Sequence, residues 1–211
     1  MPDDDLYAIL KDELYVDESL PNKEFHHENL ANYIERAMYY CPDCGLSVFE
    51  SNKDLITCKG CGKTVRYLPN KQIEGDGFDF KYQNIAQWYD GQEAFANSLN
   101  LDALPDEPLY RDEAKVFEVV LYKRKIVLDK NAQISLYPNR IEVECQNQKL
   151  VFDFDTTEVV TVLGKNKINV YFGGKVYQFK GSERMNALKY VHLFHRYKNI
   201  RKGENDEFLG L

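Results

Sequence analysis

The spacing of four cysteines constrains this 211-residue chain more than any other feature. They form two Cys-x-x-Cys pairs, Cys41–Cys44 and Cys58–Cys61, with thirteen residues between the pairs. Two residues between cysteines let both sulfurs of one turn face the same ion, so two such turns supply four thiolates at the corners of a tetrahedron. Gly45 and Gly62 follow the pairs, and glycine permits the positive φ that turns backbone N–H groups toward sulfur.

This pattern predicts a zinc ribbon at residues 40–68, with a β-hairpin between the pairs and the ligands Cys41, Cys44, Cys58 and Cys61. Four protein ligands fill the coordination sphere, so the ion is expected to be structural, and folding of so small a hairpin depends on it. Iron, which rubredoxin-like sites hold with similar turns, is the alternative metal. Two disulfides would need an oxidising compartment, and the acidic segment Met1–Asp5 lacks the positive charge of an export signal.

Charge divides the chain near residue 113. Residues 1–113 have a net charge of −13, residues 114–203 one of +9, and the acidic tail 204–211 one of −3. The shift predicts two domains, of which the second suits anionic partners such as phosphate head groups; equally, the two halves could neutralise each other across an interface. The candidate anion- or lipid-binding residues form three clusters: Lys123, Arg124 and Lys125; Lys165 and Lys167; Lys198, Arg201 and Lys202.

The acidic half is predicted to be helical around the ribbon. Apolar residues recur at helical spacing over residues 6–14, 23–39 and 84–99, and Trp88 in the third segment is the expected core anchor. Residues 100–113, with two prolines and several acids, are typical of a linker.

From residue 114 the pattern changes to strands and ends in one helix. Strands are predicted over Val116–Tyr122, Gln133–Tyr137, Arg140–Cys145, Lys149–Phe154, Glu158–Leu163, Lys167–Phe172 and Lys175–Phe179. Pro138-Asn139 and Gly173-Gly174 mark tight turns. A helix over 182–199 follows with Ser182 as its N-cap, and Cys145 is expected to be a buried apolar group. The predicted class is α+β: a helical arm with a four-cysteine ribbon, then a small antiparallel β-barrel or sandwich capped by the C-terminal helix.

Four segments together resemble a known protein region. They are Tyr39–Gly45, Cys58–Gly62, the Asn84-Ile85-x-x-Trp88-x-x-x-Gln92 stretch and Asn186–Val191. This order resembles the C-terminal extension of certain Firmicute lysophospholipid acyltransferases, relatives of 1-acyl-glycerol-3-phosphate acyltransferase. The resemblance implies that the β-half is a pleckstrin-homology-like domain and that both parts follow a catalytic domain.

The catalytic signature of that family is absent from these 211 residues. It consists of a histidine followed five positions later by an aspartate, and none of His26, His27, His192 and His195 meets that condition. The resemblance therefore implies a non-catalytic accessory region of a phospholipid-biosynthesis acyltransferase. Its expected partners are the catalytic domain, a membrane surface or another protein, and its expected location is the cytoplasm or the inner face of the membrane.

Two other functions compete with this one. The first is a zinc-ribbon adaptor that contacts protein or nucleic acid and has no link to lipid metabolism. Basic residues do lie around the ribbon, but the surrounding half is strongly acidic and repels phosphate, so nucleic acid is not an expected partner. The second is an enzyme without a recognisable motif, because no paired nucleophile and base and no phosphate-cradling glycine loop occur.

Overall fold

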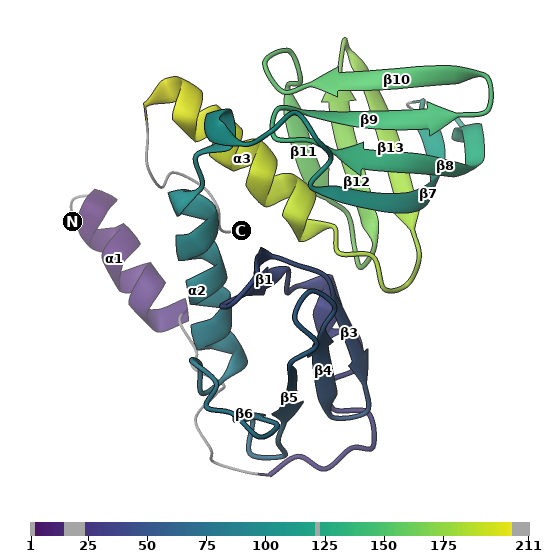
Figure 1. Cartoon of the computed structure of the whole chain (residues 1–211). Coiled ribbons are helices and arrows are strands. Elements are labelled where there is room, and N and C mark those ends of the chain that lie inside the picture. The colour runs from purple at the N-terminus through teal and green to yellow at the C-terminus, as the bar shows by residue number, and fades with distance from the viewer. Residues whose placement is uncertain (1–2, 15–23, 121–122, 204–211) are drawn as a thin grey trace.

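The computed structural model describes residues 3–14, 24–120 and 123–203. A helical arm and a small ribbon form one side of the molecule, and a curled antiparallel sheet with a C-terminal helix forms the other (Figure 1). The predicted α+β class is confirmed. Within these ranges, no helix combines the length and the apolar character that a bilayer crossing requires.

Two small sheets build the ribbon. Strands β1 (Tyr40–Cys41) and β2 (Gly45–Leu46) pair across the first cysteine turn. A second sheet has the order β3-β4-β5-β6, and its strands are β3 (Phe49–Asn52), β4 (Leu55–Cys58), β5 (Thr64–Tyr67) and β6 (Ile73–Gly75). The hairpin predicted between the cysteine pairs is confirmed as β3–β4, while the sheet continues beyond residue 68.

Helix α2 (Ile85–Ser98) confirms the helix predicted over residues 84–99. Asn84 caps it, because its side-chain oxygen accepts the N–H of Gln87 at 2.9 Å. Trp88 is 1% exposed, and its ring meets Phe49 and Phe80 edge-on at centroid distances of 5.2 and 5.1 Å. Trp88 is therefore the core anchor that the sequence predicts.

The helix predicted over residues 23–39 is wrong. Its described part contains only the 3-10 turn η1 (Ile34–Arg36). The N–H of Ala31 donates to the Lys53 carbonyl at 2.7 Å, and the N–H of Tyr33 donates to Ser51 Oγ at 2.8 Å. These bonds to the β3–β4 hairpin satisfy N–H groups that a helix would use, so tertiary pairing overrides the apolar spacing.

The β-half is one seven-stranded sheet with the order β10-β9-β8-β7-β13-β12-β11, and all neighbours are antiparallel. The strands are β7 (Tyr110–Val119), β8 (Ile126–Leu136), β9 (Arg140–Cys145), β10 (Gln148–Asp153), β11 (Val159–Val162), β12 (Lys167–Phe172) and β13 (Lys175–Gly181). All seven predicted strands are present, but β7 and β8 begin six and seven residues earlier than predicted; β7 ends at Val119, and residues 121–122 of the predicted first strand lie outside the described residues. The sheet curls around an apolar core (Figure 1), against which Cys145 is half-buried rather than fully buried as predicted.

The linker predicted over residues 100–113 is partly wrong, because two segments within it belong to the folded core. A 3-10 turn, η2 (Leu101–Ala103), places Leu101 against the β-half core with 2% exposure. Strand β7 begins at Tyr110, which is 5% exposed and lies in the same core. Buried apolar side chains therefore fix this stretch despite its prolines and acids.

Helix α3 (Leu188–Lys202) begins later than the predicted Ser182. The Ser182 carbonyl instead accepts the N–H of Met185 in a turn, at 3.2 Å. The side-chain oxygen of Asn186 then accepts the N–H of Lys189 at 3.1 Å and satisfies a free donor of the first helical turn. The apolar residues Tyr190, Leu193 and Phe194 face the sheet and are at most 2% exposed.

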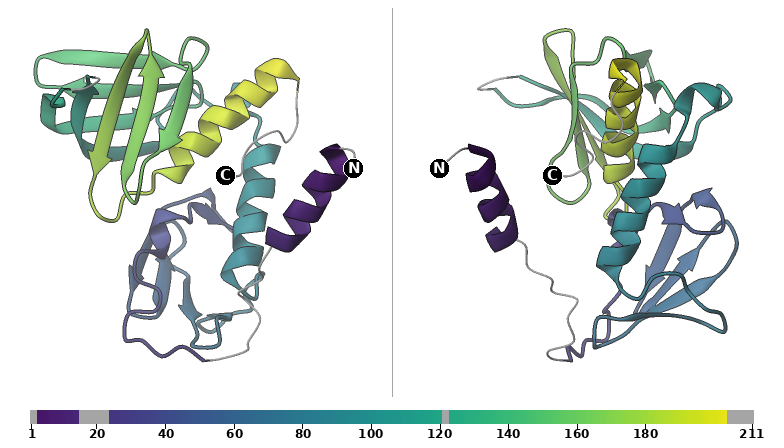
Figure 2. Two further views of the ribbon diagram at one scale, coloured as in Figure 1. Left: turned by 180° about the vertical axis from the view of Figure 1, so that it is seen from behind. Right: turned by 90° about the vertical axis from the view of Figure 1, so that its left-hand side faces the viewer.

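Helix α1 (Asp3–Leu14) confirms the first predicted helix. Its apolar residues Leu6, Ile9, Leu10 and Leu14 are nevertheless 42% to 78% exposed. Figure 2 shows the helix standing apart from the ribbon and the sheet. The apolar spacing therefore predicts the helix correctly, but not a packed face.

Ion pairs join the acidic half to the basic half across residue 113. The pairs are Glu35–Arg184, Asp102–Arg201, Asp106–Arg140 and Asp112–Lys189. Glu35 and Lys189 are buried, with side-chain exposures of 5% and 6%. This arrangement supports mutual neutralisation of the two halves for these four cations.

A buried histidine also lies at the junction between α2 and α3. His192 is 2% exposed; its Nδ1 lies 2.9 Å from the Tyr39 hydroxyl, and its Nε2 lies 3.5 Å from the Tyr89 hydroxyl. Burial lowers the pKa of His192 to about 4, and the neighbouring His195 adds to the effect. The imidazole is therefore neutral at pH 7, which lets one nitrogen donate and the other accept.

Acidification should destabilise the fold through His192. The unfolded pKa is about 6.5, so the unfolded chain binds the extra proton first as the pH falls. The contribution of His192 to the free energy of unfolding is complete above about pH 6.5. It amounts to about 3 kcal/mol and is lost as the pH falls toward 4. Urea unfolding of the wild-type chain and of His192→Gln at pH 7 and pH 4 measures this, and we expect the variant to lose less stability. The exposed His27→Gln variant should lose as much unfolding free energy between pH 7 and pH 4 as the wild type does. An equal loss for all three proteins would contradict the prediction.

Candidate metal centre

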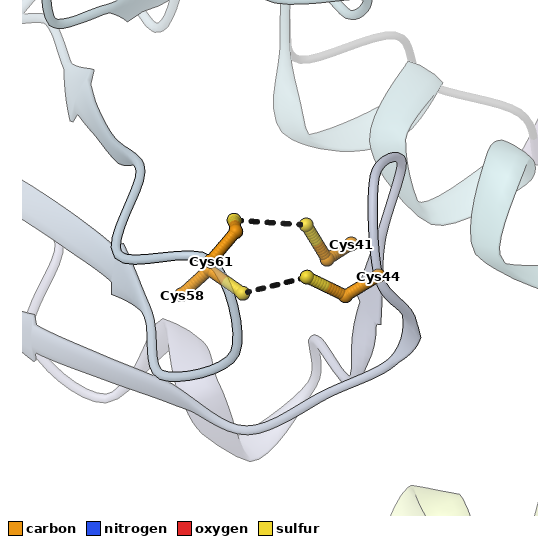
Figure 3. Close-up of side chains that lie close together, drawn as sticks. All are labelled: Cys41, Cys44, Cys58 and Cys61. Carbon is orange, nitrogen blue, oxygen red and sulfur yellow. Dashed lines mark hydrogen bonds between the residues drawn. The ribbon is translucent and has the colours of Figure 1, made fainter.

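The four predicted ligands lie together where the β1–β2 turn meets the turn after β4 (Figure 3). Their Sγ atoms all lie within 4.8 Å of one another; the Cys41–Cys61 distance is 3.8 Å and the Cys44–Cys58 distance is 3.9 Å. A tetrahedral zinc ion with bonds of about 2.3 Å needs sulfur–sulfur separations of about 3.8 Å. All four cysteines are free thiols, so neither pair is a disulfide. The cluster could therefore hold a metal ion.

Glycines shape both cysteine turns. Gly45 and Gly62 have φ of +73° and +77°, in the left-handed region that the sequence predicts for them. Gly60 serves a different purpose, because a Cβ atom there would lie 3.0 Å from Cys44 Sγ. Its missing side chain lets the second turn approach the first, which brings the two cysteine pairs within reach of one ion.

Hydrogen bonds and burial shift the pKa values of the cysteine thiols. Ser47 Oγ lies 3.0 Å from Cys58 Sγ. Burial alone would raise the pKa of Cys58, but the bonds from Ser47 and from the N–H groups of Cys61 and Gly60 outweigh it and lower the pKa to about 7. Burial raises the pKa of Cys41. Cys58 is thus prepared as a thiolate ligand, and Ser47 is a supporting residue for which the sequence pattern gives no signal.

Helix α2 holds the first cysteine turn through two side chains. Gln92, which is fully buried, accepts the N–H groups of Tyr39 at 2.7 Å and Tyr40 at 3.2 Å, and it donates to the Ala37 carbonyl at 2.9 Å. Trp88 Nε1 donates to the Tyr40 carbonyl at 2.8 Å. The sequence places both residues four positions apart on one helix, but only the structure shows that they fix the backbone before Cys41.

The same turn also contacts the β-half. The Tyr39 side chain is 1% exposed and packs in the core of the seven-stranded sheet. The Tyr110 hydroxyl lies 3.3 Å from the carbonyl oxygens of both Tyr39 and Ser47. The segment that supplies Cys41 and Cys44 is therefore shared by the ribbon and the β-half.

Acids neutralise most of the cations around the ribbon. Lys59 Nζ lies 2.7 Å from Glu50, Lys63 Nζ lies 3.0 Å from Asp43, and Arg66 pairs with Asp54. These exposed pairs add little stability, but they leave little free positive charge near the metal centre.

The candidate anion-binding residues fall into three separate places. Lys123, Arg124 and Lys125 lie before β8, at the end of the sheet where β7 finishes. Lys165 lies in the β11–β12 turn and Lys167 begins β12, and the register aligns Lys167, through Lys180 of β13, with Lys115 in the middle of β7. The third cluster, Lys198, Arg201 and Lys202, lies on α3.

The three clusters also differ in how much of their charge is free. Lys198 donates to the Asp155 carbonyl, and Arg201 pairs with Asp102. Lys125 donates to Gln178. Lys123, Arg124 and Lys165 are exposed and have no side-chain hydrogen bond or ion pair among the residues that the structure describes. The available cations are therefore in the first two clusters.

These features define a mixed α+β protein with a four-cysteine cluster that could hold a metal ion and a curled antiparallel sheet followed by a helix. No protein-family model and no curated protein sequence matches the chain.

Proposed function

We propose that this chain is a non-catalytic accessory region of a phospholipid-biosynthesis acyltransferase, that the ion in its ribbon is a structural zinc, and that its β-half docks to an anionic membrane surface. The β-half would be a pleckstrin-homology-like domain, since seven antiparallel strands followed by a helix are the elements of that fold. The resemblance of the four segments named above supports the acyltransferase assignment. Docking at the inner face of the membrane would place the chain in the cytoplasm.

Closed coordination supports a structural role for the metal. Four cysteine sulfurs converge, and with all four bound an ion would have no open position for water or substrate. Cys41 and Cys58 are 3% exposed whereas Cys44 and Cys61 are exposed, so the cluster is shielded from solvent on one side. Thiolates favour zinc, and the Ser47 hydroxyl and the N–H groups of Gly60 and Cys61, which contact Cys58 Sγ, support a thiolate ligand of the same ion.

The main support for membrane docking is that some cations of the β-half form ion pairs within the protein while others do not. Four cations of the β-half form ion pairs with acids of residues 1–113, namely Arg140, Arg184, Lys189 and Arg201. Lys123, Arg124 and Lys165 of the β-half remain exposed and have no ion pair among the described residues. Free lysine and arginine side chains next to a membrane are attracted by anionic head groups. The paired cations around the ribbon make the nucleic-acid alternative weaker.

Co-sedimentation with vesicles tests this function. We expect the metal-loaded chain to pellet with mixed phosphatidylcholine–phosphatidylglycerol vesicles and to stay in solution with pure phosphatidylcholine vesicles. The bound fraction should fall as salt is raised, because exposed charges are screened over about 10 Å at 0.1 M salt. Equal and negligible pelleting with both vesicle types at low salt would overturn the docking role.

A further inference from the structure

The outer face of the sheet contains a row of lysines that no sequence motif marks. In the strand register Lys167 lies opposite Lys180 on β13, and Lys180 lies opposite Lys115 on β7. Each is next to a core residue with no exposure, namely Ile168, Phe179 and Val116. Because neighbouring side chains in a strand point to opposite faces, the three lysines point away from the core.

These lysines are close to one another and unneutralised. Residues directly opposite in antiparallel strands have Cβ atoms about 4.5–5.5 Å apart, and like charges in such positions repel. None of the three has an ion pair or side-chain hydrogen bond among the described residues, and Lys165 extends the row at the β11–β12 turn. Glu113, two residues before Lys115, is the nearest acid on that strand face. An external anion would relieve the repulsion.

The same face becomes apolar toward its other end. Val159, Tyr171, Val176 and Val119 are consecutive cross-strand partners on β11, β12, β13 and β7. Val159 and Tyr171 are 40% and 36% exposed. Three residues of β7 lie between Lys115 in the lysine row and Val119 in this apolar row, which puts the two rows about 13 Å apart. Seen from behind in Figure 2 (left), the light-green strands β12 and β13 lie at the front of the sheet.

We propose that this face, defined by Lys115, Lys167 and Lys180 with the apolar row beside them, is the surface that binds anionic phospholipid. The lysines would contact head-group phosphates, and the apolar row would rest against the glycerol region. A membrane suits this face better than nucleic acid, because the apolar row offers mainly aliphatic side chains rather than a set of stacking rings. The proposal rests on the membrane-docking function and names the face that performs it.

Charge reversal on the full, metal-loaded chain tests the assignment. We expect Lys115→Glu/Lys180→Glu to reduce the affinity for phosphatidylglycerol-containing vesicles by about tenfold or more, since each lysine near an anionic surface contributes substantially. The matched control, Lys53→Glu/Lys81→Glu, makes the same charge change at exposed positions of the ribbon half and should bind within about twofold of wild type.

Three outcomes would overturn the assignment. The first is that Lys115→Glu/Lys180→Glu and the control variant both bind the vesicles with the affinity of the wild type. The chain would then still dock to the membrane, but through another face. The second is loss of binding only in Lys123→Glu/Arg124→Glu, which assigns docking to the segment before β8. The third is salt-sensitive binding of the wild type to single-stranded DNA with no binding to vesicles. Circular dichroism of each variant, with unchanged spectra, excludes loss of folding as the cause.

Discussion

Cys41→Ser should release the metal and unfold the ribbon. Structural zinc contributes about 10–16 kcal/mol of apparent binding free energy in zinc-finger peptides, far more than a core as small as this one provides. Cys41 is a buried ligand candidate that lies directly after the backbone held by α2. We expect purified wild type to carry one metal ion per chain by inductively coupled plasma mass spectrometry, and the variant to carry almost none. The same spectrum distinguishes zinc from iron.

The only tryptophan reports the structural consequence. Trp88 is buried between Phe49 and Phe80, so unfolding of the ribbon should shift its fluorescence to the red. Cys145→Ser is the matched control, because Cys145 lies in β9 and outside the cluster. This control should keep both the metal and the emission maximum. A Cys41→Ser protein that holds metal as tightly as wild type would contradict a four-sulfur site.

Asp112→Ala should be among the most destabilising single changes in the β-half. Lys189 Nζ lies 2.7 Å from Asp112 Oδ2, and the Tyr190 hydroxyl donates to the same oxygen at 2.6 Å. Burial lowers the pKa of Lys189, and Asp112 opposes that shift. Removing the carboxylate leaves a buried ammonium without its partner, which costs about 3–5 kcal/mol. Urea unfolding followed by circular dichroism at pH 7 measures the loss.

Two comparisons separate the ion pair from simple packing. In Asp112→Ala/Lys189→Met both charges are absent, and we expect most of the lost stability to return, because apolar replacements of buried pairs are often neutral. Asp106→Ala also removes an ion-pair partner, that of Arg140, but the Asp106 side chain is 74% exposed. This change should therefore lower the free energy of unfolding by no more than about 1 kcal/mol. Equal losses for Asp112→Ala and Asp106→Ala would contradict the burial argument.

The sequence predicts the β-half and the four-cysteine cluster well, for one shared reason: both are encoded by local spacing. Strands β9 and β12 have their predicted bounds, because polar and apolar residues alternate and turn residues follow. The two Cys-x-x-Cys pairs likewise determine which sulfurs meet. A period of two or a gap of two residues can be read without knowledge of the rest of the fold.

Features that depend on distant contacts are not encoded in this way. The apolar spacing of residues 23–39 predicts a helix, but bonds to Lys53 and Ser51 replace it. Gln92 and Ser47 have ordinary sequence surroundings, and only the folded chain brings them to the cysteine turns. The lysine row is hidden for the same reason, since its members come from three strands and only the register aligns them.

The sharing of Tyr39 has a practical consequence for fragment design. A piece cut at the change of charge near residue 113 would lack Tyr39, Leu101 and Tyr110, all of which fill the interior of the sheet. The truncated sheet would expose part of its apolar interior to solvent, and exposed apolar surface promotes aggregation. The composition boundary and the folding boundary of this molecule are therefore different places.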